Sequence, residues 1–163
     1  MFRNKIVVID LTTGQMKVLR KKNEPEETYI RGIRISATKQ YMIVLLKDQY
    51  APLFLLAYCL NSELQFHFRP FQVWELKTGS LLRSVTFHQI TALEWCPNAI
   101  IVPSPNNATP PSIKEQFVFA TPDGALHFYV VENNQISAMQ MHIDIGIGMV
   151  SSLAWYVVRS ELG

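Results

Sequence analysis

The sequence predicts an all-β fold built from repeated antiparallel hairpins. Residues 71–76 form a run rich in aromatic and β-branched side chains, which is typical of a β-strand. The turn residues Lys77-Thr78-Gly79-Ser80 follow, and an apolar segment at 81–87 returns. An acidic residue, Leu, any residue, Thr and Gly occur in that order at 10–14 and again at 75–79. The same hairpin therefore recurs along the chain.

The repeated hairpin matches the end of a WD repeat, which is the unit of a β-propeller blade. Residues 73–79 read Val-Trp-Glu-Leu-Lys-Thr-Gly, with the Trp and the acidic residue at the end of the first strand. Each WD repeat contributes four strands, so the other segments can be placed as strands of blades.

The composition indicates a folded domain with little net charge. The chain has 163 residues, of which 48% are hydrophobic and 17% charged, and its formal net charge is +2. This apolar content is enough to bury a core and argues against disorder along the whole chain. A basic cluster at 17–22 is followed at once by acidic residues at 24–27, so we expect no nucleic-acid partner.

The two cysteines, Cys59 and Cys96, form neither a CxxC pair nor a Cys/His ligand spacing. We therefore expect no metal site and no cofactor. Residues 1–5 lead directly into a strand and not into the apolar core of a signal peptide. These features predict a cytoplasmic protein that is not secreted.

The first hairpins can be placed from the apolar pattern. Residues 5–11 and 16–20 are predicted strands joined by a turn at 12–15. Residues 30–36 alternate between apolar and polar side chains, as expected of a half-buried strand. After a short turn, the nearly continuous apolar run at 41–46 indicates a strand that is covered on both faces.

An apolar stretch at 49–69 interrupts the repeat. Asp10 and Glu75 lie 65 positions apart, and removing these 21 residues leaves about 44, close to the length of a WD repeat. Three interpretations remain open: a loop insertion, a membrane anchor and an intron retained in the gene model. We favour the intron, because so apolar a block is unusual in a surface loop. Its core at 51–60 contains Pro52 and is too short to span a bilayer, so no transmembrane segment is expected.

The second half of the chain opens with one strand and a long loop. Residues 89–96 are predicted to begin a further blade. The segment 97–115 is predicted to be a Pro-rich loop, and its prolines exclude regular structure from 97 to 112. The glycosylation pattern Asn107-Ala108-Thr109 is treated as chance, because no secretory signal precedes it.

The remaining residues complete this blade and begin another. Three strands and one tight turn are predicted, at 116–120, 125–131, 135–143 and 121–124. Residues 146–148 read Gly-Ile-Gly, but no helix follows and the third glycine of a dinucleotide loop is missing, so they are interpreted as a linker. A last strand at 150–156 repeats the Leu-x-Trp pattern of 93–95, and 156–163 is a divergent tail.

Together these elements predict a partial WD-repeat β-propeller over 1–163. It would contain about two full four-stranded blades and partial blades at both ends. A propeller has at least four blades, and a repeat unit does not bury its faces alone. We therefore expect the chain to be a fragment of a longer protein.

Six segments carry a more specific signal. They are Ile-Val-Val-Ile-Asp-Leu-Thr-Thr-Gly at 6–14, Leu-Lys-Asp at 46–48 followed by Pro-Phe-Gln-Val-Trp-Glu-Leu at 70–76, Ile-Thr-Ala-Leu-Glu-Trp-Cys-Pro at 90–97, Gln-Phe-Val-Phe-Ala-Thr-Pro-Asp-Gly at 116–124, and Ser-Ser-Leu-Ala-Trp at 151–155. In this order they resemble the second β-propeller of the WD repeat-containing protein eleven family. The resemblance covers nearly all of the chain except 49–69 and the last residues, and Cys96 stands where a Ser is expected in the family.

This resemblance implies a large scaffold with two propellers and a helical C-terminal part. It implies a role in tethering endosome-derived vesicles at the trans-Golgi network, and in cilium formation and Hedgehog signalling. The protein would then be associated with the Golgi or the cilium, and would contact trafficking membranes through partner proteins. The family has no catalytic residues to transfer to this chain.

Two function classes are compatible with the sequence. One is a non-catalytic protein–protein interaction scaffold, whose partner-binding residues the sequence does not identify. The other is a small-ligand binder or enzyme fragment built on a propeller, which needs polar residues on the innermost strands, where only Arg31, Arg34 and Glu94 stand out. The histidines lie on or beside different strands, without an evident catalytic partner: His67, His88, His127 and His142. We therefore expect no catalytic, cofactor-binding or metal-binding residue.

The intron interpretation of 49–69 makes a direct prediction about the message. Sequencing the transcript across the codons for Asp48 to Pro70 should show these two codons joined. A mature transcript that contains all 21 intervening codons would contradict the intron and leave the insertion or the anchor.

Overall fold

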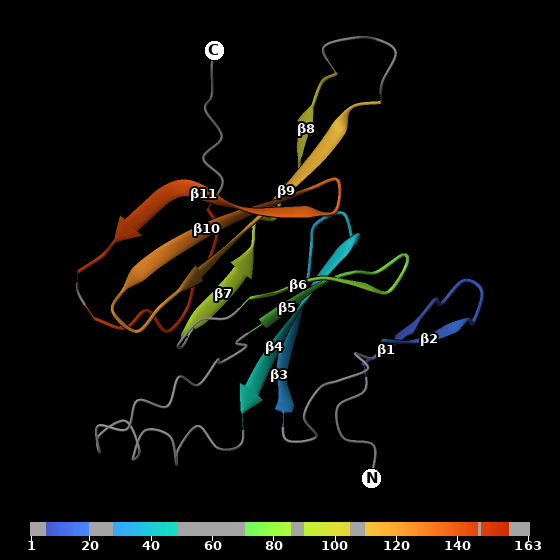
Figure 1. Ribbon diagram of the computed structural model, residues 1–163, viewed down its shortest axis with the longest axis horizontal. Helices are drawn as coiled ribbons and strands as arrows, with labels where there is room; N and C mark the ends of the chain where they lie inside the picture. The colour runs from blue at the N-terminus through green and yellow to red at the C-terminus, as the bar shows by residue number, and fades with distance from the viewer. Residues whose placement is uncertain are drawn as a thin grey trace. The chain divides into compact units, whose positions relative to one another are not determined.

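A computed structural model describes residues 6–19, 28–48, 71–85, 90–104, 110–146 and 148–156. The chain divides into two compact units, Met1–Gln89 and Ile90–Gly163. The described residues form eleven strands and no helix. The strands belong to three antiparallel sheets of two, four and five strands (Figure 1). The all-β prediction is therefore confirmed.

The first unit begins with a two-stranded hairpin. β1 (Ile6–Ile9) and β2 (Met16–Leu19) pair antiparallel, from Ile6 opposite Leu19 to Ile9 opposite Met16. Two backbone hydrogen bonds close the turn, from Gly14 N to Asp10 O at 2.8 Å and from Asp10 N to Gln15 O at 2.9 Å. This hairpin is the half blade that the sequence predicts at 5–20.

The same unit contains a four-stranded blade. Its strands lie in sequence order, β3-β4-β5-β6, and each neighbouring pair is antiparallel. At the turn between β5 and β6, Gly79 has a φ of 70° and its N–H donates to Glu75 O at 2.9 Å. The predicted central hairpin is confirmed. The strand bounds are β3 Thr28–Ile35, β4 Tyr41–Asp48, β5 Phe71–Glu75 and β6 Ser80–Val85.

The hairpin packs against the blade through an apolar cluster. Leu19 of the hairpin lies with Met42, Val44 and Trp74 of the blade, and all four side chains are buried. Burying side chains of this size contributes about 1.5–3 kcal/mol each. The contact between hairpin and blade is therefore a main source of stability in this unit. Six half-buried apolar residues pack around the cluster: Ile6, Val8, Ile30, Leu46, Leu76 and Leu81.

β4 is buried on both faces. Met42 and Val44 belong to the apolar cluster, and Tyr41 and Ile43 point to the opposite face because successive side chains of a strand alternate. All four side chains are buried. The prediction from the continuous apolar run is confirmed.

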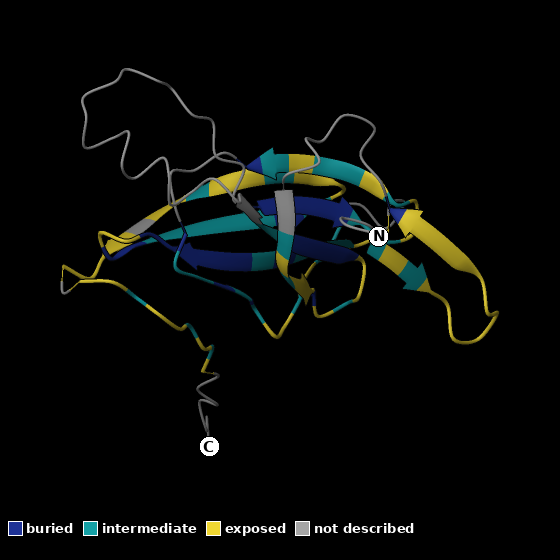
Figure 2. Ribbon diagram, turned by 90° about the horizontal axis from the view of Figure 1, so that it is seen from below, coloured by how far each residue is buried: buried dark blue, intermediate teal, exposed yellow. Residues whose placement is uncertain are grey.

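The second unit contains the other blade. Four strands lie in the order β7-β9-β10-β11, and a short strand, β8, also pairs with β9. Its core is aromatic, because the Trp95 and Phe117 ring centroids lie 5.1 Å apart and Phe117 stacks on Tyr129 at 5.4 Å. Figure 2 shows buried residues within strands, and exposed residues both at the turns and along parts of other strands. The bounds are β7 Ala92–Trp95, β8 Ile100–Val102, β9 Ser112–Ala120, β10 Ala125–Glu132 and β11 Gln135–Asp144.

The prediction that 97–115 is a loop without regular structure is wrong at both ends of the segment. Residues Ile100–Val102 form β8, and β9 already begins at Ser112. The two strands pair antiparallel, with Ile101 opposite Ile113. Three consecutive β-branched residues favour an extended strand, and Pro103 lies outside it, where no ladder hydrogen bond is lost.

The strand predicted at 150–156 is also wrong, because these residues are not assigned to a strand. Leu153 and Trp155 are half-buried, and Ala154 between them is exposed, as the pattern predicts. A strand needs a neighbouring strand for its backbone hydrogen bonds. No other described segment pairs with 150–156. An apolar alternation alone is therefore not sufficient to form a strand here.

The apolar stretch at 49–69 and the tail residues 157–163 lie outside the described residues. The strands that flank the stretch are neighbours in the blade, with Leu45 opposite Phe71. Without the stretch, four residues would join this pair, which is a common length for a hairpin loop. The intron interpretation stays a prediction.

Gly79 and Gly14 occupy corresponding turns but have different surroundings. Both have positive φ, 70° and 68°. A Cβ on Gly79 would lie 2.5 Å from Lys17 Cε and 2.6 Å from Leu19 Cδ2, whereas a Cβ on Gly14 would meet nothing within 4 Å. The Gly79 turn of the blade therefore lies directly against the hairpin, whereas the hairpin's own turn at Gly14 has open space around the glycine.

We predict that Gly79→Ala lowers the free energy of unfolding by about 1 kcal/mol more than Gly14→Ala. Both substitutions place an L side chain at positive φ, but only the first displaces Leu19 from the cluster. Urea unfolding of the whole protein that carries this chain measures the difference. Equal losses for the two variants would contradict the packing of the hairpin on this turn.

Candidate protein-interaction surface

The histidines do not form a catalytic group in the described residues. The His127 ring stacks on Phe119, with ring centroids 4.9 Å apart. His142 lies opposite His127 in the β10–β11 register, and its side chain is outside the described set. His67 and His88 also lie outside the described residues. His127 therefore serves as an aromatic packing residue.

The polar residues of the innermost strands contact their own backbone. Arg34 Nη1 donates to Ile33 O at 3.1 Å, and Trp95 N donates to Glu94 Oε1 at 3.2 Å. Arg31 is exposed. Across the described ranges, no three His, Cys, Asp or Glu side chains come together in a way that could hold a metal ion. The described residues also contain no helix that is long and apolar enough to cross a membrane.

The acidic residue of the repeated turn motif has a structural role. Asp10 Oδ1 accepts hydrogen bonds from Thr12 Oγ1 at 2.6 Å, Thr12 N at 2.8 Å and Thr13 N at 3.4 Å. These bonds stabilise the ionised carboxylate and lower the pKa of Asp10 to about 2. In the matching turn, Glu75 accepts a hydrogen bond from Thr78 Oγ1. In both turns a threonine hydroxyl donates to the acidic residue, but from different motif positions: Thr12 at the variable position and Thr78 at the recurring one.

The turn between β9 and β10 uses a carboxylate in the same way. Asp123 Oδ1 accepts from Thr121 Oγ1 at 2.5 Å and from Ala125 N at 3.4 Å. The bond from Thr121 is the main cause that lowers the pKa of Asp123. A Cβ on Gly124 would lie 2.8 Å from Gly148 O, so the linker passes directly over this turn. The polar groups of this turn are therefore used in its own closure.

β8 and the first part of β9 extend the second blade beyond β7. Trp95 of β7 lies opposite Phe117, and Ile100 of β8 lies opposite Lys114, so β9 pairs with the two strands one after the other. We call residues 100–102 together with 112–115 the β8–β9 arm. Figure 1 shows this arm projecting from the remainder of the sheet.

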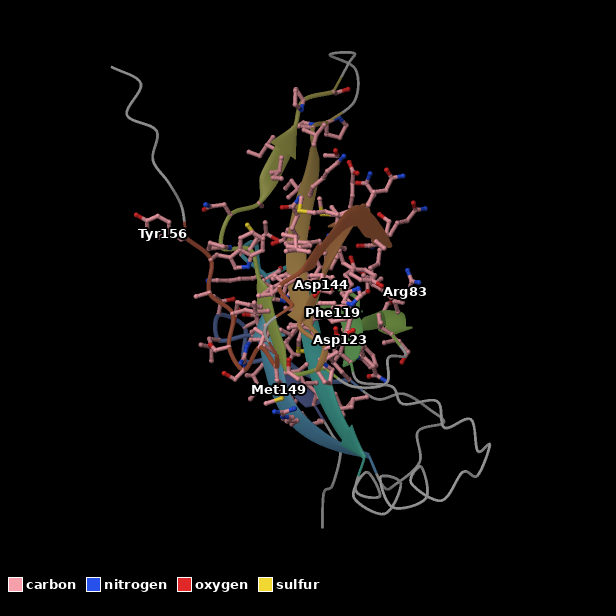
Figure 3. All side chains as sticks on the ribbon, turned by 90° about the vertical axis from the view of Figure 1, so that its left-hand side faces the viewer. Arg83, Phe119, Asp123, Asp144, Met149 and Tyr156 are labelled. Atoms are coloured by element: carbon pink, nitrogen blue, oxygen red, sulfur yellow. The ribbon has the colours of Figure 1, made fainter. Side chains whose placement is uncertain are left out.

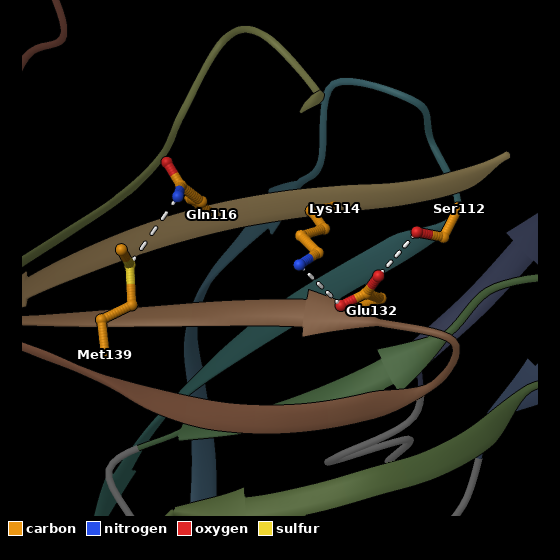
Figure 4. Close-up of polar contacts among 5 residues, drawn as sticks. All are labelled: Ser112, Lys114, Gln116, Glu132 and Met139. Atoms are coloured by element: carbon orange, nitrogen blue, oxygen red, sulfur yellow. Dashed lines mark hydrogen bonds and ion pairs between the residues drawn. The ribbon is translucent and has the colours of Figure 1, made fainter. Parts of the chain in front are cut away.

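Side chains of β9 and β10 hold the arm to the blade. Glu132 of β10 accepts a hydrogen bond from Ser112 Oγ at 2.6 Å and pairs with Lys114 Nζ at 3.1 Å (Figure 4). The bond from Ser112 and the contact with Lys114, in that order, lower the pKa of Glu132. Outside the arm, Gln116 Nε2 of β9 donates to Met139 Sδ of β11 at 3.7 Å, across the intervening strand β10. The position of the arm is thus set by polar contacts as well as by the ladder.

The exposed apolar side chains of each unit mark its candidate contact surfaces. In the first unit, the face of the hairpin turned away from Leu19 is apolar and exposed, and consists of Val7, Ile9, Met16 and Val18. In the second unit, Ile101 of the arm is 69% exposed and Tyr156 is 87% exposed. Figure 3 shows Tyr156 standing apart from the sheet. Such surfaces are typical of contacts with other parts of a protein or with partners.

A model of the WDR11 second beta-propeller family matches residues 1–152. The chain belongs to this family. WD repeat-containing protein 11 of Mus musculus is 24% identical to this chain over an alignment of 195 positions. The alignment covers 94% of this chain and 14% of the mouse protein. The proteins of the same name from Danio rerio and Homo sapiens are 23% identical with the same coverage. The chain thus spans about a seventh of the length of these curated relatives.

The sequence did not identify the arm as a candidate surface of this WDR11 second β-propeller. The prolines on either side of it favour a loop when the sequence is considered alone. The signal that could have found it is the run Ile100-Ile101-Val102, which is as β-branched as the strand at Ile6–Ile9.

The Ser112–Glu132 bond makes a prediction that depends on pH. Glu132 has a folded-state pKa below its ordinary value of 4.5, so its contribution to stability is complete above that value. The contribution is lost as pH falls through the lower folded-state pKa. We predict that Ser112→Ala raises the pKa of Glu132 and increases amide exchange in β8. NMR titration of the side-chain carboxyl measures the pKa.

A matched control is Ser137→Ala, since Ser137 is an exposed serine of β11 that pairs with Val130. It should leave the Glu132 titration unchanged. An unchanged titration in Ser112→Ala as well would contradict the contact between Ser112 and Glu132.

Proposed function

We propose that the chain is part of a non-catalytic protein-interaction scaffold, in which propeller blades present loops and strand edges to other proteins. The observation that carries this proposal is the match of residues 1–152 to the WDR11 second beta-propeller family. The use of Asp10, Glu75 and Asp123 for turn closure supports it, because these carboxylates are occupied with their own backbone and threonines.

The finer role is proposed from the resemblance to the same family. The whole protein would tether endosome-derived vesicles at the trans-Golgi network and act in cilium formation and Hedgehog signalling. It would work in the cytoplasm at the Golgi or the cilium, and would reach membranes through partner proteins. Its mechanism is then the presentation of several binding surfaces by one protein, without a chemical step.

The alternative, a propeller that binds a small ligand or carries an enzyme site, needs polar groups that converge on the inner strands. Arg34 Nη1 donates to Ile33 O, and Glu94 Oε1 accepts from Trp95 N, so each has a partner on its own strand. The two classes are separated by a thermal melt of the whole protein with metals and metabolites, because a ligand of the folded state raises the melting temperature. A rise of several degrees with one compound would count against the scaffold.

The tethering role predicts that moving the protein moves the vesicles. The whole protein fused to a mitochondrial outer-membrane anchor should gather endosome-derived vesicles around mitochondria. Trp74→Asp should abolish this gathering, because a charge in the apolar cluster with Leu19 separates the hairpin from the blade. Electron microscopy and a cargo marker for the vesicles provide the measurement.

Thr38→Ala is a conservative control on a surface turn of the same blade, and should gather vesicles like the unchanged protein. If the unchanged anchored protein gathers no vesicles, the tethering role is wrong.

A further inference from the structure

β8 has one edge that is paired and one that is open. In the described part of the chain, β8 pairs with β9 and with no other strand. An edge strand presents backbone N–H and C=O groups that can pair with an extended segment of another chain. The pairing of β9 determines which backbone N–H and C=O groups of β8 face β9 and which face outward.

The backbone of β9 alternates between its two neighbours. Gln116 O accepts from Cys96 N at 2.8 Å and Ala120 O accepts from Thr91 N at 2.9 Å, so the even-numbered residues face the β7 and β8 side. The β9–β10 register runs from Lys114 to Ala120 without a shift, so this alternation continues to Lys114 and on to Ser112.

This alternation turns the backbone of Ile101 outward. Ile100 and Val102 lie opposite Lys114 and Ser112, whose N–H and C=O groups face β8. Ile101, between them, therefore directs its own N–H and C=O away from β9. One residue of an added antiparallel strand can form two hydrogen bonds with such a residue.

The edge is short and is followed by Pro103, but it carries no charged side chain that would keep other strands away. Natural sheets keep edges soluble with charged side chains, and β8 has none in its sequence Ile-Ile-Val. Its Ile101 side chain is 69% exposed and its Ile100 side chain 44% exposed, so apolar surface is available on both faces of the strand. Pro103, which has no N–H, limits how far an added strand can pair in that direction.

We propose that the open edge of β8 at Ile101 binds an extended, apolar segment of a partner protein by strand addition. The proposal rests on the scaffold function and names a binding site for it. The partner segment has β-branched or aromatic residues at neighbouring positions and no proline opposite Ile101, because its residue there donates and accepts a backbone hydrogen bond. Its side chains pack beside Ile100 and Ile101.

A short peptide segment fits this edge better than a second copy of the chain. β8 has three residues, and pairing of two such strands buries far less than the roughly 1,200 Å² of a stable protein–protein interface. A flexible segment needs only a few paired residues and side-chain contacts to bind reversibly.

The matched variants are Ile101→Pro and Ile101→Val in the whole protein. Proline removes an N–H that faces outward, so the β8–β9 ladder keeps its hydrogen bonds, while valine keeps both the N–H and the apolar side chain. A phage-displayed library of random 12-residue peptides is the probe. We expect selected peptides to be rich in Ile, Val and aromatic residues and to bind Ile101→Pro at least roughly tenfold more weakly. Their affinity for Ile101→Val should stay within roughly twofold.

Amide exchange in the unbound protein is a second measurement that needs no variant. The Ile101 amide should exchange quickly, the Ile100 and Val102 amides slowly, and a selected peptide should slow Ile101. Slow exchange of Ile101 without peptide would overturn the proposal, because the edge would already be covered. Peptides that bind the wild type and Ile101→Pro equally would also overturn it. So would self-association of the wild type that Ile101→Pro abolishes, because the occupant would then be a second copy.

Failure at this edge is distinguishable from failure of the scaffold function. If only the edge is wrong, the wild-type protein on mitochondria still gathers vesicles. If the scaffold function is wrong, a metal or metabolite raises the melting temperature of the whole protein by several degrees, which does not depend on this edge.

Discussion

The burial of Trp74 between the β1–β2 hairpin and the four-stranded blade is the contact on which the first unit depends. Trp74 lies with Leu19, Met42 and Val44 in one cluster, and its Nε1 donates to Gln72 Oε1 at 3.0 Å. The large side chain is thus buried without an unsatisfied polar atom. A hairpin of two short strands is only marginally stable alone, so β1 and β2 hold their position because the blade covers them.

The recurring turns explain why the sequence repeats where it does. Each repeated turn needs a glycine at positive φ and a carboxylate that accepts from a nearby threonine, as at Asp10 and Glu75. The carboxylates and the threonine hydroxyls form hydrogen bonds with each other within the turn. Exposed apolar side chains remain on strand faces and on the β8–β9 arm. This division between turn chemistry and exposed strands is consistent with a scaffold that binds through shape and backbone edges.

Local patterns predicted the strands and hairpins well, because β-branched runs and Gly-containing turns act over a few residues. The central hairpin at 71–85 and the doubly buried run at 41–46 are examples. Two errors came from non-local pairing. Ile100–Val102 becomes a strand because Ser112–Lys114 lies beside it, and 150–156 is not a strand because no described partner lies beside it. The outward direction of the Ile101 backbone depends on the β9 register and could not be predicted from sequence.

The most direct test of the blade-to-hairpin packing is a double-mutant cycle on Leu19 and Trp74 in the whole protein. Leu19→Ala, Trp74→Phe and the double variant are compared by urea unfolding, with Leu19 and Ile43, which points to the opposite face of β4, as the control pair. The packing predicts a coupling energy of about 1 kcal/mol or more between Leu19 and Trp74, and additive effects within about 0.5 kcal/mol for the control pair. Additive effects for Leu19 and Trp74 would contradict it.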